Sequence, residues 1–254
     1  ALAGADPVGM AIMQLRRRLN YATFEGWISD LALPDGDGGG EIGAALVTAL
    51  VAEWRLRGGH RILVSVHRAE DRRLAALRDA GFEEGFVDYR LAPVTVPTVP
   101  MPAGVSVRPL SEVDGDAVTR LIAEFGPRRS PVPDRMEAVL RTYAVHAREV
   151  AAGRAASVVA ELDGTTVGVC TLEWQRPFWT DELQAWIPDL VVTEPVRGRG
   201  IGRSLLAAAL RAARDAGAAE VRLETGARRA AAHGLYRSTG FVEAGRTWIL
   251  RRED

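Results

Sequence analysis

A turn rich in glycine and arginine follows a short apolar run in the second half of the chain. Its glycines stand at alternate positions, and glycine lacks the Cβ atom that would keep an anion away from the backbone amides. An Ala- and Leu-rich run continues to about residue 216 and predicts a helix, whose first turn offers unpaired amides and a partial positive charge. We therefore predict that this turn binds a diphosphate. Its glycines and arginines are Arg197, Gly198, Arg199, Gly200, Gly202 and Arg203.

Two common nucleotide-binding motifs do not fit the turn. A P-loop requires a lysine, and this chain contains none. A dinucleotide-binding turn requires a third small residue where this chain has Arg203. The remaining pattern is Arg-x-x-Gly-x-Gly between a strand and a helix, at Arg197, Gly200 and Gly202. This pattern resembles the acyl-coenzyme-A-binding motif of the GNAT superfamily of N-acetyltransferases.

A second motif follows in the order and at the spacing of that superfamily. A strand pattern over residues 221–225 precedes a stretch, residues 231–241, that is similar to the family's Ala-x-x-Leu-Tyr-x-x-x-Gly-Phe helix and turn. The resemblance implies that Tyr236 lies near the thioester sulfur and protonates the departing thiolate. Seven residues earlier, where the family often has asparagine, this chain has Arg229, which could meet a phosphate or point to solvent.

The resemblance also implies a gap between the fourth and fifth strands of the domain. Backbone groups of the fourth strand would pair there with the pantetheine arm of the coenzyme and polarise the acetyl carbonyl. The residues that the resemblance assigns to acetyl coenzyme A are Leu190, Val191, Val192, Arg197, Gly198, Arg199, Gly200, Ile201, Gly202, Arg203, Ser204 and Arg229. No metal is expected.

Transfer to an amine also requires a group that accepts the amine proton. Asp189 lies eight residues before Arg197, where some family members carry an acidic residue, and we predict it as the base. Glu173 and Glu224 are alternatives, and so is a chain of water molecules. Asp30 aligns with Asp189 in the internal repeat described next, which favours a structural role for the pair. A nearby aromatic and acidic stretch could hold a cationic amine or could only pack under a loop; it contains Trp174, Trp179, Asp181, Glu182 and Trp186.

The chain repeats itself with a shift of 159 residues, which places Trp27 on Trp186 and Gly81 on Gly240. The first copy has lost the chemical residues of the second, because Gly38, Glu41 and Leu77 stand at the positions of Arg197, Gly200 and Tyr236. A carboxylate inside the turn would repel a diphosphate, and Asp35 and Asp37 would add to the repulsion. We predict that the first copy keeps the fold but binds no coenzyme.

The repeat and the composition define the expected organisation. We predict two α/β folds of the GNAT type with mixed sheets: a degenerate repeat over residues 1–95, a Pro-rich linker over 96–104 and a catalytic domain over 105–254. Residues 105–159 have no counterpart before Ala1. We expect that the sequence begins inside the first repeat, and the alternative is a protein that carries only half of this module. Within the second copy we predict a strand at 105–108, a capping box at Ser111 and Asp114 that opens a helix to Phe125, a loop at 126–133, a helix at 134–151 and a hairpin around Asp163-Gly164.

The chain has the composition of an ordinary soluble protein, with 47% hydrophobic and 26% charged residues. A net charge of −1 gives no basic surface for nucleic acid, and no apolar run is long enough to predict a membrane span. The single cysteine, Cys170, lies in an apolar strand pattern, where a buried and inert thiol is expected in a cytoplasmic protein.

We therefore expect an acetyl-coenzyme-A-dependent N-acetyltransferase, monomeric or homodimeric. It would transfer the acetyl group by direct attack of a primary amine of a small molecule or peptide. One alternative is a non-catalytic acyl-coenzyme-A-binding or scaffold protein that retains the fold. A nicotinamide-binding domain is a weaker alternative, because the third glycine is missing.

Overall fold

The computed structural model describes residues 2–3, 6–19, 23–34, 39–66, 71–125, 135–177 and 180–252. The first half contains β1 (Leu2–Ala3), β2 (Asp6–Pro7), β3 (Met10–Arg17), β4 (Phe24–Ala32), α1 (Gly39–Leu56), β5 (Arg61–Val66), α2 (Asp71–Asp79) and β6 (Glu83–Leu91). The second half contains β7 (Val105–Pro109), η1 (Glu112–Asp114), α3 (Gly115–Phe125), α4 (Arg135–Ala151), β8 (Ala155–Leu162), β9 (Thr165–Gln175), β10 (Gln184–Trp186), β11 (Leu190–Val192), η2 (Glu194–Val196), α5 (Ile201–Asp215), β12 (Glu220–Gly226), α6 (Ala230–Ser238) and β13 (Val242–Arg251).

Local sequence signals account for several of these boundaries. The predicted hairpin joins β8 to β9 through Asp163 and Gly164, whose φ angles of 50° and 80° are those that a tight hairpin turn requires. The predicted capping box forms at Ser111 and Asp114, although it opens the short 3-10 helix η1, and α3 follows directly. The predicted loop at 126–133, together with residues 35–38 and Trp179, lies outside the described residues.

The two halves repeat the same order of elements about 159 residues apart. From β3 to β6 the first half follows strand, strand, helix, strand, helix, strand. The second half follows the same order from β9 to β13, with β10 and β11 together in the place of β4. The strand register repeats as well. Glu25 of β4 lies opposite Arg61 of β5 in a parallel pair, and Gln184 of β10 lies opposite Glu220 of β12 in the same way.

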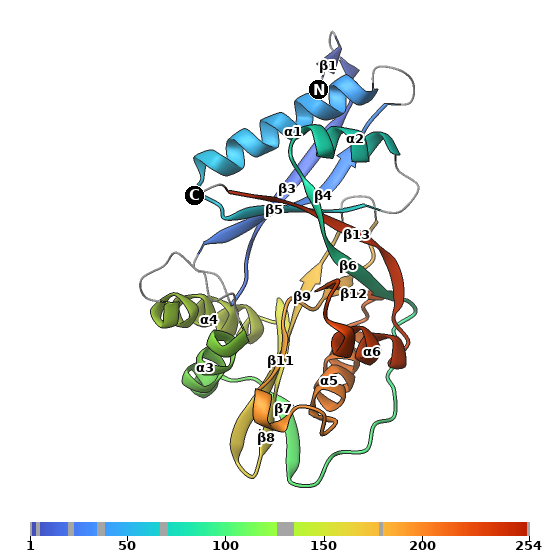
Figure 1. Cartoon of the computed structure of the whole chain (residues 1–254). Helices are drawn as coiled ribbons and strands as arrows, with labels where there is room; N and C mark the ends of the chain where they lie inside the picture. Colours follow the sequence, from blue (N-terminus) through green and yellow to red (C-terminus); the bar gives the residue numbers. More distant parts are fainter. Residues whose placement is uncertain are drawn as a thin grey trace.

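Strands of both halves form a single mixed sheet, in the order β3-β4-β5-β13-β6-β12-β10-β9-β8-β7, with β11 alongside β9. The last strands of the halves are exchanged: β13 lies between β5 and β6 of the first half, and β6 lies between β13 and β12 (Figure 1). Val87 of β6 is paired with Arg246 of β13, its own counterpart in the repeat. The exchange is therefore symmetric about that pair of residues.

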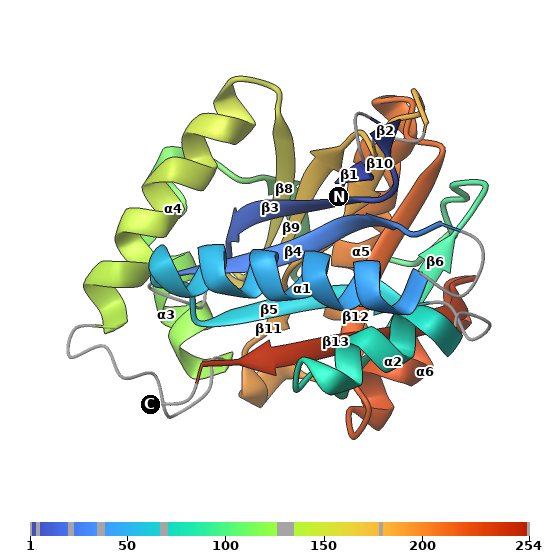
Figure 2. The same ribbon diagram turned by 90° about the horizontal axis from the view of Figure 1, so that it is seen from above.

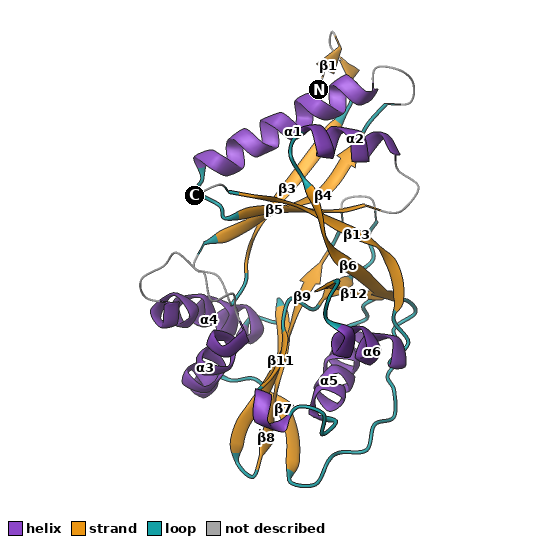
Figure 3. Cartoon of the chain, viewed as in Figure 1, coloured by secondary structure: helices purple, strands orange, loops and turns teal. Residues whose placement is uncertain are grey.

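Helices cover the sheet in three groups (Figure 3). α1 and α2 lie across β3, β4 and β5 (Figure 2). Val47, Trp54 and Leu77 of these helices belong to one apolar cluster with Trp248 of β13. In the second half, α3 and α4 cover one face of the sheet and α5 covers the other. Leu19 of the first half packs into the core under α3 and α4, so the halves share apolar contacts as well as strands. None of the described helices has the length and apolar content needed to cross a membrane.

Candidate active site

The glycine-rich turn leads from η2 into α5. Gly198 and Gly200 have φ angles of 79° and 87°, which side chains with a Cβ atom rarely adopt, and Gly200 caps α5. The Gly200 carbonyl accepts hydrogen bonds from the amides of Arg203 (3.0 Å) and Ser204 (3.1 Å). Within the described ranges, the amides of residues 198–202 donate to no protein group. The turn therefore presents open amides at a helix N-terminus, as a diphosphate requires.

The predicted coenzyme residues around the turn have different environments. Arg197, Arg199 and Arg203 are exposed, and two of them are already oriented: the Nε of Arg197 donates to the Val192 carbonyl (2.8 Å) and Arg203 donates to Ser238 (2.9 Å). The remaining two side chains, Ile201 and Ser204, are buried under the turn. Ile201 and Ser204 therefore support the turn, and only their backbone groups could contact a ligand.

Part of the predicted linker lies against the turn. Residues 99–102 and the residues of the turn line a hollow of about 640 Å³, which Ala231 and Leu235 of α6 complete. A Cβ atom placed on Gly200 would lie 3.4 Å from Cγ of Pro102. The Pro-rich stretch thus forms one wall of the candidate coenzyme site, a position that its composition did not predict.

The predicted gap between strands is present beside β11. β10 is parallel to β12 as far as Ile187, after which the chain bonds only to β9 within the described part of this sheet. Backbone groups of Asp189 and Thr193 bond to β9 (2.9 Å each). Because these groups alternate along a strand, those of Leu190 and Val192 point away from β9, toward the space beside β12. The side chain of Val191 is buried.

Tyr236 lies on α6 in an aromatic cluster. Its ring contacts Phe241 (6.0 Å between centroids) and Tyr89 (5.6 Å), and the Tyr89 hydroxyl is hydrogen-bonded to Nδ1 of His233 (2.8 Å). The Tyr236 hydroxyl has no hydrogen bond to any other described residue, and burial raises its pKa, so it is protonated at neutral pH. Tyr89 belongs to β6 of the first half, and no motif in the sequence predicted that it would reach this site.

The predicted base, Asp189, is 2% exposed, and neither carboxylate oxygen has a hydrogen-bond partner among the described residues. Its amide donates to Oγ1 of Thr171 (3.1 Å), which fixes the backbone but leaves the carboxyl group unused. Burial raises the pKa of Asp189. Burial also raises the pKa of Glu173 to about 7, against the opposing charges of Arg16 and Arg18.

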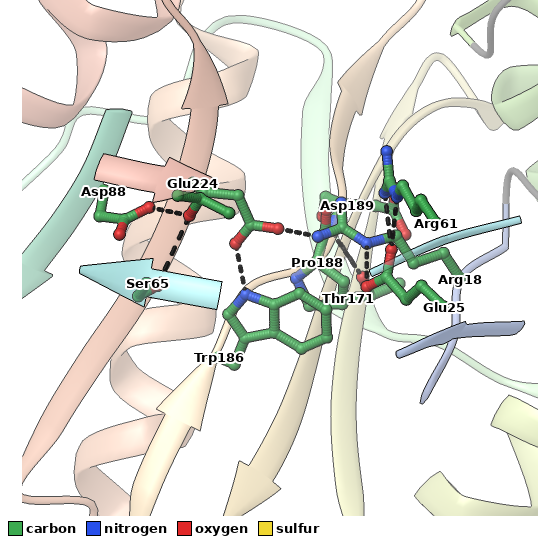
Figure 4. Close-up of polar contacts among 11 residues, drawn as sticks. Arg18, Glu25, Arg61, Ser65, Asp88, Thr171, Trp186, Pro188, Asp189 and Glu224 are labelled. Carbon is green, nitrogen blue, oxygen red and sulfur yellow. Dashed lines mark hydrogen bonds and ion pairs between the residues drawn. The ribbon is translucent and has the colours of Figure 1, made fainter. Parts of the chain in front are cut away.

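Glu224, the other alternative base, is engaged in a buried network at the junction of the halves (Figure 4). It accepts a hydrogen bond from Nε1 of Trp186 (2.7 Å) and forms an ion pair with Arg18. Arg18 in turn donates to Glu25 (2.9 Å), which Arg61 also contacts (2.6 Å). Glu224 is therefore part of the link between the halves and offers no free carboxylate.

Two further predicted residues lie near the aromatic cluster and the junction. Arg229 caps α6 and folds over Gly226, and its charge offsets part of the rise that burial causes in the pKa values of Tyr236 and Asp189. Trp186 does not offer an open face to a cationic amine, because the guanidinium groups of Arg16 and Arg18 lie 4.4 Å and 4.8 Å from its ring centroid.

A cavity of about 460 Å³ opens between the halves on the side of Asp189 and Glu173. Residues 15–19 of the first half form one wall. Residues of α4 and β9, together with residues 154–155 and 188–189, form the rest. The exposed pair Arg154–Glu149 (2.6 Å) lies at this cavity. Burial lowers the pKa of His146, which also lines the cavity, to about 4, so this side chain is neutral at physiological pH.

Comparisons with known proteins agree with this geometry. The model of the acetyltransferase (GNAT) family matches residues 118–241. Aminoalkylphosphonate N-acetyltransferase of Salmonella typhimurium is 37% identical over 86 residues, which cover 32% of this chain and 53% of that protein. The chain therefore matches about half the length of this curated relative.

Solved structures share the fold over the whole chain. A tandem GNAT protein from the clavulanic acid biosynthesis pathway has a TM-score of 0.65 at 16% identity and covers 100% of this chain and 82% of its own. A GCN5-related N-acetyltransferase from Kribbella flavida has a TM-score of 0.64 at 14% identity, and the match covers 98% of this chain and 89% of that protein. The family match thus covers residues 118–241 in the second half, and the fold of the whole chain is similar to that of these two solved structures.

Proposed function

We propose that this chain is an acetyl-coenzyme-A-dependent N-acetyltransferase whose second half holds the coenzyme. One observation carries the proposal: three elements meet at Gly202. A Cβ atom placed there would lie 3.8 Å from Val192 of β11 and 3.7 Å from Leu235 of α6, the neighbour of Tyr236. The open amides of the turn, the free edge of β11 and the candidate acid are therefore adjacent.

The residues present fit the coenzyme. The amides of residues 198–202, with Arg197, Arg199 and Arg203, would hold the diphosphate. The backbone groups of Leu190 and Val192 would orient the pantetheine arm and stabilise negative charge on the acetyl oxygen. Acetyl coenzyme A supplies the activated acetyl group, as a thioester, when it is bound.

The chain's own side chains would then move two protons. Tyr236 holds a proton at neutral pH and has its hydroxyl free of described partners, so it can donate to the leaving thiolate. Glu173 and Asp189 face the cavity from which an amine would attack, and they would accept its proton. The pKa of about 7 for Glu173 lies near the pH at which a general base is most effective. Cys170 is fully buried with a raised pKa, which supports direct attack without an acyl-cysteine.

The acceptor in this proposal is a primary amine of a small molecule. The cavity of about 460 Å³ lies in the range of small-molecule sites, roughly 300–1,000 Å³. The curated relative is named for a small amine substrate, which supports the same choice over a peptide. The single free cysteine fits a cytoplasmic enzyme.

The first half would bind no coenzyme. Glu41 lies in the first turn of α1, where its carboxylate would meet a diphosphate, and Leu77 is fully buried in the apolar core at the position of Tyr236. Gly38 lies outside the described residues.

Calorimetry with acetyl coenzyme A tests the coenzyme site, and we expect one site per chain. Thiol release with a panel of amines tests the activity. Two equivalent sites would contradict the role given to the first half. Coenzyme binding without thiol release for any amine would instead favour the non-catalytic acyl-coenzyme-A-binding protein.

A further inference from the structure

The first half contributes an arginine to the cavity between the halves. Arg16, at the end of β3, is only 7% exposed and lines that cavity. Its guanidinium group lies over the rings of Trp27 (4.3 Å) and Trp186 (4.4 Å). The two rings hold the planar guanidinium group in one orientation. They supply no hydrogen-bond acceptor for its N–H groups, because the tryptophan side chain is only a donor.

The Nη1 group of Arg16 is buried and has no hydrogen-bond partner in the described part of the chain. Burying a charged donor without an acceptor is unfavourable, so such a group points to an acceptor that the protein itself does not supply. Glu25 acts on Arg16 electrostatically, but its two oxygens already accept from Arg18 and Arg61.

Arg16 differs from its neighbours in the buried network. Arg18 and Arg61 form ion pairs with Glu25 and Glu224, whereas Arg16 forms no ion pair with any described residue. Glu173 also acts on Arg16 electrostatically, so the candidate base and the unpartnered guanidinium group lie close together along the cavity. A ligand between them would need an amine at one end and an acceptor of hydrogen bonds at the other.

We propose that the acceptor substrate is a small amine that carries an anionic group, and that Arg16 of the first half binds this group. The proposal rests on the acetyltransferase function proposed above. The shared chemistry is that of a carboxylate or a phosphonate a few bonds from a primary amine. The first half then has a role in substrate selection although it binds no coenzyme.

Three primary amines of similar size test the proposal: aminoethylphosphonate, β-alanine and the uncharged propylamine. For at least one anionic amine, we expect the kcat/KM of the wild-type chain to exceed that for propylamine by about tenfold or more. The reason is that a hydrogen bond between two charged groups is stronger than one between neutral groups. Arg16→Met keeps the apolar stem between the two rings but removes the charge. It should raise KM for the anionic amines about tenfold relative to KM for propylamine, a ratio that a change in the pKa of the shared base Glu173 does not alter. A comparison of β-alanine with aminoethylphosphonate shows whether a carboxylate or a phosphonate is preferred.

Binding gives a readout that does not depend on turnover. In a calorimetric titration of the chain saturated with coenzyme A, the preferred anionic amine should bind the wild type and Arg214→Met equally, and Arg16→Met about tenfold more weakly. Arg214 is a matched control because its side chain is 53% exposed on α5.

Equal kcat/KM for all three amines in the wild type would overturn the proposal, whether or not Arg16→Met folds. An equal loss for all three amines in a folded Arg16→Met would also overturn it, because it would show a structural role. If coenzyme binds but no amine is acetylated, the proposed function fails. The titration then still decides whether Arg16 binds the anion.

Discussion

Glu25 is the most deeply buried charge at the junction of the halves, and its replacement by glutamine should destabilise the whole chain. The side chain is 0% exposed and lies between Arg18 (2.9 Å) and Arg61 (2.6 Å). Burial alone would raise its pKa, but the two arginines outweigh burial and lower the pKa to about 2 from 4.5. The charged form is therefore the favoured one in the folded chain.

The size of the effect follows from that shift. A difference of about 2.5 pKa units corresponds to about 3 kcal/mol of stability. Glu25→Gln removes this contribution and leaves two buried guanidinium groups without their shared partner, a change of the kind that costs about 3–5 kcal/mol. We expect the free energy of unfolding at pH 7 to fall by about 3 kcal/mol. Because the folded pKa is the lower one, the contribution is complete above about pH 4.5 and is lost as the pH falls toward 2.

Urea unfolding followed by tryptophan fluorescence measures the difference, with Glu53→Gln as the matched control. Glu53 forms an exposed ion pair with Arg57, so its replacement should change the free energy of unfolding by less than about 1 kcal/mol. The difference between wild type and Glu25→Gln should also shrink below pH 4.5. A loss under about 1 kcal/mol at pH 7, with an unchanged m value, would refute the electrostatic argument. So would a loss that stays the same at acidic pH.

Three further predictions concern the proposed function. Gly200→Glu should weaken coenzyme binding about tenfold or more by calorimetry, because its carboxylate would face the diphosphate. The control Gly153→Glu, which is also at a positive φ angle (70°) but in open space, should leave the affinity unchanged. Equal affinities of the two variants would show that the diphosphate lies elsewhere. Tyr236→Phe should retain coenzyme binding and lower turnover by roughly 10²-fold, and unchanged turnover in stopped-flow measurements would leave the side chain only a packing role. Because the pKa of Glu173 is raised to about 7, more of its side chain is in the carboxylate form above pH 7, and kcat/KM should rise through this pH. Glu173→Gln should remove this rise from the pH profile. A Glu173→Gln variant that retained the rise would exclude Glu173 as the base.

The parts of the site that depend on neighbouring residues could be predicted from the sequence. The turn at Gly198 and Gly200 needs only glycines at two positive φ angles and the start of a helix, and these signals lie within a few residues. The hairpin at Asp163-Gly164 formed for the same reason. The repeat also predicted the order of the elements correctly, because apolar patterns follow the secondary structure of each copy.

The parts that depend on which strands pair could not be predicted in this way. The pattern of β6 is the same whether it pairs within the first half or beside β12, so nothing in it indicated that Tyr89 would reach Tyr236. Arg16 likewise gains its place only when β3 is brought near β9 and Trp186. Identification of the repeat predicted two similar units and gave no sign that they would exchange strands.

The exchanged strands also restrict how this chain can evolve. Both neighbours of β13, β5 and β6, belong to the first half. Loss of the first half would leave β13 with two unpaired edges, a state that favours aggregation. Side chains of the first half can therefore change, but its strands cannot be deleted without loss of the sheet that the second half needs. The strand exchange thus makes divergence of side chains in one half tolerable and removal of that half harmful.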